Sequence, residues 1–216
     1  MKRLIVGALT IGMLSGCASV AKKQETSFGK EVIDVPATYS LQEVVDKTVE
    51  TIGARATNIQ KVVGFMPEDL PDKPSHPKFQ MKDIGIGFTS MTFTSISCGE
   101  KAVATVSGQE PGLKNVYGTS EVSGYKACIY PYKKGYRVYI IGTYMKSDSN
   151  GIGGLLTRVI EKSVNKATCN GMDTFDCWWD QIVQKSKEEF KDAKIIAIEY
   201  PVNKNLLKKT AKKAKE

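Results

Sequence analysis

Alternating apolar and polar residues in the middle of the chain constrain its fold more than any other feature of its 216 residues. From Tyr125 to Tyr132, and again from Tyr136 to Met145, tyrosine, valine and isoleucine recur in the pattern of a pleated strand. Lys133-Lys134-Gly135 lies between the two runs and predicts the turn of a β-hairpin. Local hairpins of this kind indicate an antiparallel sheet.

The same periodicities predict the other elements. Ser40 and Glu43 form a capping box at the start of a helix whose apolar stripe runs from Leu41 to Ile52. The remaining predictions are a strand at 58–65, a proline-rich loop at 67–77, β structure over 84–106 with a bulge or bend near Thr89-Ser90, helices at about 153–167 and 174–190, and a last strand at 194–200. This order predicts a single α+β domain, with an antiparallel sheet of about 4–6 strands and with the N-terminal helix and a C-terminal helix pair on one face.

The first residues of the chain have the parts of an export signal. Lys2 and Arg3 supply positive charge, and Leu4 to Leu14 is an apolar run, shorter than the roughly 20 residues that span a bilayer. Leu14-Ser15-Gly16-Cys17 follows, and it resembles the lipobox of bacterial lipoproteins. The resemblance implies removal of residues 1–16 and acylation of Cys17, with chains such as palmitate. Because Ala18 stands where an aspartate would favour inner-membrane retention, it also implies the outer membrane, facing the periplasm.

The positive charge of the chain is concentrated at its C-terminus. The formal net charge is +8, and loss of Lys2 and Arg3 leaves +6, of which residues 204–216 carry +5. That tail is expected to be disordered and to contact an anionic envelope surface or simply to remain solvated. The lysines proposed for the contact are Lys208, Lys209, Lys212, Lys213 and Lys215. A body of nearly zero net charge does not favour nucleic-acid binding.

Residues 17–38 lack periodicity and are expected to form a lipidated tether, followed by a globular domain at 39–203.

Four cysteines remain once Cys17 is acylated, an even number in an expected oxidising compartment. Their positions favour two disulfides, Cys98–Cys128 between predicted strands and Cys169–Cys177 at the corner between predicted helices. A zinc site is the other interpretation. Spacings of 29, 40 and 7 intervening residues and a single histidine fit zinc poorly. We therefore expect disulfides, no metal and no cofactor.

Tyrosines are concentrated in the predicted hairpin and suggest a candidate binding face. The six tyrosines are Tyr125, Tyr130, Tyr132, Tyr136, Tyr139 and Tyr144. Alternation places Tyr130, Tyr132 and Cys128 on one face together with Lys126, and Tyr125 on the other. An open face of this kind would bind a glycan, a peptide or a protein. The competing interpretation is ordinary sheet packing.

Other reactive residues form no catalytic constellation. His76 lies between prolines with no local nucleophile or orienting partner, and we expect it to be exposed. Gly151-Ile152-Gly153-Gly154 lacks the spacing of a phosphate-binding loop and is expected to be a helix entry. Asp173, Asp176 and Asp180 suit the N-terminal part of a helix better than a metal site.

Three functions follow as hypotheses. The first is a non-enzymatic envelope lipoprotein that binds or supports another envelope component, either a protein or an anionic polymer. The second is a periplasmic module that binds a lipid or a glycan. The third is an enzyme that uses carboxylates or a reactive dithiol at Cys169 and Cys177.

Overall fold

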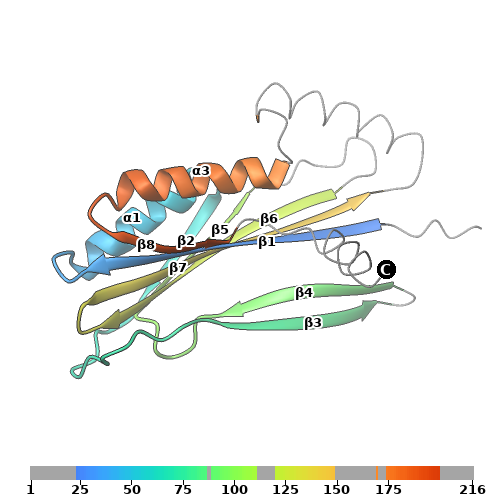
Figure 1. Cartoon of the computed structure of the whole chain (residues 1–216). Coiled ribbons are helices and arrows are strands. Elements are labelled where there is room, and N and C mark those ends of the chain that lie inside the picture. The colour runs from blue at the N-terminus through green and yellow to red at the C-terminus, as the bar shows by residue number, and fades with distance from the viewer. Residues whose placement is uncertain (1–22, 87–88, 111–119, 149–168, 170–173, 200–216) are drawn as a thin grey trace, which may run out of the picture.

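The computed structural model describes residues 23–86, 89–110, 120–148, 169 and 174–199 (Figure 1). Six strands form one antiparallel sheet in the order β2-β5-β6-β7-β1-β8. They are β1 (Lys23–Pro36), β2 (Thr57–Val63), β5 (Ala104–Glu110), β6 (Ser120–Tyr132), β7 (Gly135–Asp148) and β8 (Lys194–Glu199). A separate two-stranded hairpin contains β3 (Lys78–Ile86) and β4 (Thr89–Ser97). The prediction of an α+β domain built on an antiparallel sheet is confirmed.

The prediction of a tether at 17–38 is wrong from Lys23 onward. Residues Lys23–Pro36 form β1, which lies inside the sheet and pairs with β7 along its whole length and with β8 on its other side. The folded domain therefore includes Lys23–Pro36, which the prediction had assigned to the tether. This strand gives little periodic signal because two of its buried positions hold Gly29 and Glu31, which are not the apolar residues that mark a core face.

Two helices lie on one face of the sheet, α1 (Leu41–Gly53) and α3 (Thr174–Glu189) (Figure 1). Helix α1 begins with the predicted capping box, in which the Ser40 hydroxyl accepts from the Glu43 amide and the Glu43 carboxylate accepts from the Ser40 amide. One hydrophobic core joins both helices to the sheet, and Val44, Ile52, Trp179 and Ile182 are fully buried in it. The predicted helix at 153–167 lies outside the described residues.

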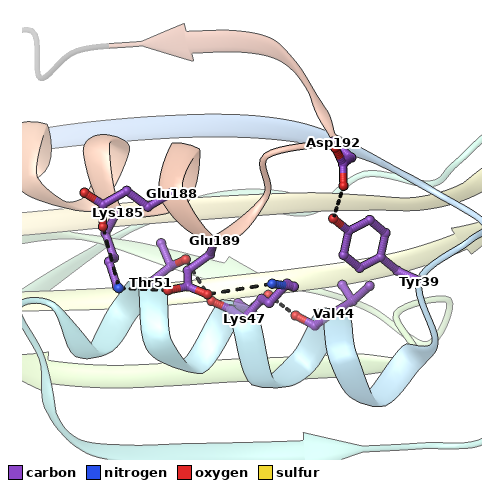
Figure 2. Close-up of polar contacts among 9 residues, drawn as sticks. Tyr39, Val44, Lys47, Thr51, Lys185, Glu188, Glu189 and Asp192 are labelled. Carbon is purple, nitrogen blue, oxygen red and sulfur yellow. Dashed lines mark hydrogen bonds and ion pairs between the residues drawn. The ribbon is translucent and has the colours of Figure 1, made fainter.

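Polar side chains form contacts along the solvent side of the interface between α1 and α3 (Figure 2). Glu189 accepts from Lys185 on its own helix at 2.8 Å and lies 3.8 Å from Lys47 of α1. Just outside the two helices, the Tyr39 hydroxyl donates to Asp192 at 3.3 Å. Exposed pairs of this kind contribute little free energy, so the buried apolar residues provide most of the helix packing.

The β6–β7 hairpin belongs to the six-stranded sheet, and the β3–β4 hairpin lies outside it. The β6–β7 turn is the predicted one, and Gly135 adopts a φ of 137°, where a Cβ would lie 2.1 Å from the Val35 carbonyl oxygen. The change of phase near Thr89-Ser90 is a chain reversal and not a bulge, because Ile86 and Thr89 are paired as β3 turns into β4.

No helix in the described part of the chain is long and apolar enough to cross a membrane.

Candidate ligand-binding cleft

Three residues of β6 hold the end of β4 against the sheet face opposite the helices. They are Lys126, Cys128 and Tyr130, which share one face because side chains alternate along a strand. The Lys126 ammonium donates to the Ile96 carbonyl at 2.9 Å, and the Tyr130 hydroxyl donates to the Cys98 carbonyl at 2.7 Å. Between them, Cys128 forms a disulfide with Cys98. The outward face of β6 therefore serves first as an anchor for the hairpin.

An open cleft of about 420 Å³ begins where this anchor ends. Its volume is in the range of small-ligand sites. Gly124 lies two residues before Lys126 on the same face and leaves room, because it has no side chain. Its cross-strand partners are Gln109 on β5 and Thr143 on β7. The complete lining is Asn58, Gln60, Ser95, Ile96, Ser107, Gly108, Gln109, Gly124, Tyr125, Lys126 and Thr143.

Uncharged hydrogen-bonding side chains dominate this cleft. Three are amides and three are hydroxyls: Asn58, Gln60, Gln109, Ser95, Ser107 and Thr143. Lys126 is the one charged residue among the described lining residues, and its ammonium already donates to the Ile96 carbonyl. Amides and hydroxyls both donate and accept, so the cleft suits a neutral ligand that is rich in polar groups.

The tyrosines predicted as an open binding face are packed. Five of them, Tyr125, Tyr130, Tyr132, Tyr136 and Tyr144, are at most 8% exposed, and Tyr139 is half-buried. Burial raises the pKa of Tyr130, and Tyr139 adds to this shift. The structure therefore favours the sheet-packing interpretation, because helices cover one face of the hairpin and the β3–β4 hairpin anchors on the other.

Both predicted disulfides are present. Cys98 pairs with Cys128 and Cys169 pairs with Cys177, with Cα–Cα distances of 5.4 and 5.5 Å. The four cysteines thus form two separate staples. One fastens the end of β4 to β6, and the other fastens residue 169 to the first turn of α3.

The remaining candidates contribute no site in the described part of the chain. His76 is exposed, as expected, and Asp176 lies in the first turn of α3. No group of three or more metal-ligating side chains occurs among the described residues. Cys17, Asp173, the 151–154 glycine segment and the tail lysines lie outside those residues.

A partly buried ion pair lies on the helix side of the sheet, at the end of α1. Arg55 forms a salt bridge with Glu110 and places its guanidinium 4.7 Å from the centre of the Trp178 ring. Burial and the charge of Glu110 raise the pKa of the Tyr125 phenol, while Arg55 acts in the opposite direction. Tyr125 is therefore neutral, and it is buried on the core side of the strand whose other face forms the cleft.

Glu31 of β1 is a fully buried carboxylate beneath α3. Burial raises its pKa from 4.5 to about 7, against the opposing effects of the Ser186 hydroxyl and the Lys187 charge. Ser186 Oγ lies 2.6 Å from Glu31 Oε1 and 2.9 Å from the Val183 carbonyl oxygen. A hydroxyl has one proton to donate, so both contacts are satisfied when a protonated Glu31 donates to Ser186 and Ser186 donates to Val183.

Glu31→Gln is expected to remove a pH dependence of stability. The folded-state pKa lies above the unfolded value, so wild-type stability is full below about pH 4.5 and falls as the pH rises through 7. The total loss is about 3 kcal/mol, which the glutamine variant avoids. Urea unfolding at pH 5 and pH 8.5 measures most of this loss, because the larger part of it falls between these two pH values, with exposed Glu188→Gln as the matched control. An unchanged pH dependence in Glu31→Gln would contradict the assignment.

Apart from Tyr125, the cleft residues were not predicted as a site from the sequence. They lie on five different strands, β2, β4, β5, β6 and β7, and fit no motif, so only the strand register brings them together. The one available signal was weak: polar side chains alternate at Asn58 and Gln60 and at Ser107 and Gln109. Lys126 was placed on the correct face, but its bond to the hairpin was not foreseen.

Comparisons with known proteins leave the chain without an assigned family. No protein-family model matches it, and no curated protein does. Among solved structures, one similar chain is norcoclaurine synthase from Thalictrum flavum, solved in complex with dopamine and hydroxybenzaldehyde. The match covers 87% of this chain and 98% of that one, at 9% identity and a TM-score of 0.22. A TM-score this low carries no conclusion about the fold or the function.

Proposed function

We propose that this protein is a non-enzymatic lipoprotein of the cell envelope that binds or supports another envelope component. Acyl chains on Cys17 anchor it in the outer membrane, with the folded domain in the periplasm. The cleft beside Lys126 is the observation that carries the binding role. The two disulfides support the proposed compartment, because reducing compartments keep such cysteines as thiols.

The basic tail strengthens the attachment in this proposal. Lysines near an anionic membrane surface contribute about 1 kcal/mol each. Lys208, Lys209, Lys212, Lys213 and Lys215 would contact phospholipid head groups or an anionic wall polymer. No nucleic-acid partner is proposed, because the charge outside the tail and the signal segment is close to neutral.

A module that binds a lipid or a glycan is the second candidate, and the polar lining of the cleft favours the glycan over the lipid. The enzymatic alternative is less well supported. A dithiol mechanism would need Cys169 and Cys177 to form a reversible pair in which one thiol has a low pKa. In the structure the two residues form a disulfide at the first turn of α3. Thiol titration of the purified protein under mild reduction tests this alternative.

In-cell crosslinking followed by mass spectrometry tests the proposed role. We expect wild-type protein in the membrane fraction, crosslinked to one dominant envelope component. Cys17→Ser is expected to release the protein from that fraction, because the thiol that carries the lipid is lost. A version ending at Asn203 shows whether the lysine tail makes the contact. Membrane attachment that persists in Cys17→Ser, or the absence of a crosslinked component in every version, would contradict the proposal.

A further inference from the structure

We infer that the envelope component held in the cleft is a neutral glycan, whose sugar rings lie across strands β5, β6 and β7 beside the end of β4. This inference rests on the proposed function, which it deepens by naming the class of ligand. The argument depends on three features of the cleft: its charge, its row of hydrogen-bonding groups and its aromatic flank.

The charge of the lining disfavours ionic ligands. Among the described lining residues there is no carboxylate to hold a cation, and the one ammonium, that of Lys126, donates to Ile96. A phosphate or carboxylate ligand would need free cationic donors, usually arginine. Acyl chains would need apolar walls, whereas Ile96 and Tyr125 are the apolar residues among these eleven. A neutral polar ligand therefore fits best.

The hydrogen-bonding groups form two rows across the sheet. The strand register aligns Gln60, Ser107 and Lys126 in one row, and Gln109, Gly124 and Thr143 in the next. Facing residues on neighbouring antiparallel strands are about 5 Å apart. Gln60 and Gln109 are exposed and Ser107 is half-buried, so their side-chain polar atoms are accessible to a ligand. The half-buried Thr143 hydroxyl donates to the Gly124 carbonyl at 3.2 Å and keeps its capacity to accept. Repeated amides and hydroxyls at this spacing match the repeated hydroxyls around a sugar ring.

Aromatic rings flank the second row. Phe28 of β1 is the cross-strand partner of Thr143 and continues the row beyond Thr143, outside the residues that line the cleft. Its ring meets that of Phe79 edge to face at 5.4 Å, and Phe79 is 44% exposed. Exposed aromatic surface next to polar groups suits the apolar C–H face of a sugar, because such a ligand is amphipathic in the same way.

Asn58 adds an observation at the mouth of the cleft. It has a φ of 52°, in the left-handed region, which is uncommon for residues other than glycine. The pairing of β2 with β5 is irregular between Thr57 and Gln60, on either side of Asn58. The Asn58 side chain is exposed at this irregularity and lines the cleft. Asparagine adopts this conformation more readily than most residues other than glycine, so Asn58 can interrupt the regular pairing without large strain.

The test measures binding of oligosaccharides to the full-length lipoprotein in detergent micelles. Calorimetry and NMR titration would use N-acetylglucosamine oligomers and maltooligosaccharides of two to six sugars. We expect saturable binding of at least one series. Gln109→Ala should weaken it by about fivefold to tenfold through lost hydrogen bonds. Gly124→Leu should abolish it, because the new side chain occupies the floor of the cleft. Gln184→Ala, on the exposed side of α3, is the matched control and should leave binding unchanged.

The outcomes separate this inference from the proposed function. Absence of binding to both series, or binding that Gln109→Ala and Gly124→Leu leave intact, would overturn the glycan site. The glycan site would also be overturned if the protein bound anionic phospholipid vesicles or an uncharged peptide and Gly124→Leu abolished that binding. Membrane fractionation of the same preparations reports independently on the lipoprotein role. Loss of glycan binding with normal membrane attachment and an unchanged crosslinked component would leave the proposed function standing.

Discussion

Replacing Trp179 by alanine is expected to lower the free energy of unfolding by about 4 kcal/mol, which corresponds to a melting temperature lower by roughly 10 °C. Trp179 is fully buried and belongs to the core that joins α3 to the sheet. Its indole lies directly over a cross-strand pair of glycines, Gly29 of β1 and Gly142 of β7. Urea and thermal unfolding measure the loss. Trp178→Ala is the control, and it should cost less because Trp178 is half-buried and stacks on Arg55.

The glycine pair supplies a sharper version of the same test. A Cβ on Gly29 would lie 2.7 Å from the Trp179 ring, so Gly29→Ala should cost about 1–3 kcal/mol in the wild type. In the Trp179→Ala background the space is free, and the same substitution should be nearly neutral. A double-mutant cycle measures this coupling. Gly124→Ala, on the opposite sheet face, should show no coupling to Trp179. Additive effects of Gly29→Ala and Trp179→Ala would contradict the packing described for β1.

Removing the Cys98–Cys128 disulfide is expected to destabilise the protein by about 3.5 kcal/mol in the chain-entropy relation for its sequence separation of 30. The Cys98→Ala/Cys128→Ala variant should also disturb the cleft, since the disulfide lies between the Lys126 and Tyr130 contacts that hold β4. Urea unfolding gives the stability, and NMR shifts of Ser95, Ile96 and Gln109 report on the cleft.

The second disulfide is the matched control. Its sequence separation of 8 corresponds to about 2.5 kcal/mol in the same relation. The Cys169→Ala/Cys177→Ala variant should therefore be less destabilised and should leave the cleft resonances unchanged, because this staple fastens the start of α3. Equal perturbation of the cleft by both variants would show that Cys98–Cys128 has no special part in shaping it.

Local chemistry was sufficient to predict several elements. The capping box at Ser40, the hairpin turn at Gly135 and the apolar stripe of α1 are short-range patterns, and the structure confirms all three. Both disulfides were predicted from the positions of their cysteines relative to the predicted strands and helices. The lipobox prediction is also local, and it stays a prediction because Cys17 lies outside the described residues.

Long-range pairing decided the features that were mispredicted. Lys23–Pro36 contains glycine, glutamate, lysine and threonine and has no clear alternation, yet β7 and β8 pair with both of its edges. From the sequence, Gly29 and Glu31 fit a solvated linker. In the structure, Gly29 lies under the Trp179 ring and Glu31 is buried beneath α3. Tyr125, Tyr130 and Tyr132 were assigned to the correct faces, but their burial depended on which elements cover each face.

The sequence by itself thus determined the class of the domain, its disulfide pairing and its main turns, because each of these is written in residues that are close along the chain or in the alternation of single strands. Only the tertiary structure decided that β1 is an interior strand of the sheet and that a polar cleft opens beside β4. Those features arise from the register between β2, β5, β6, β7 and β1, which is set by packing of the whole core and not by any local pattern.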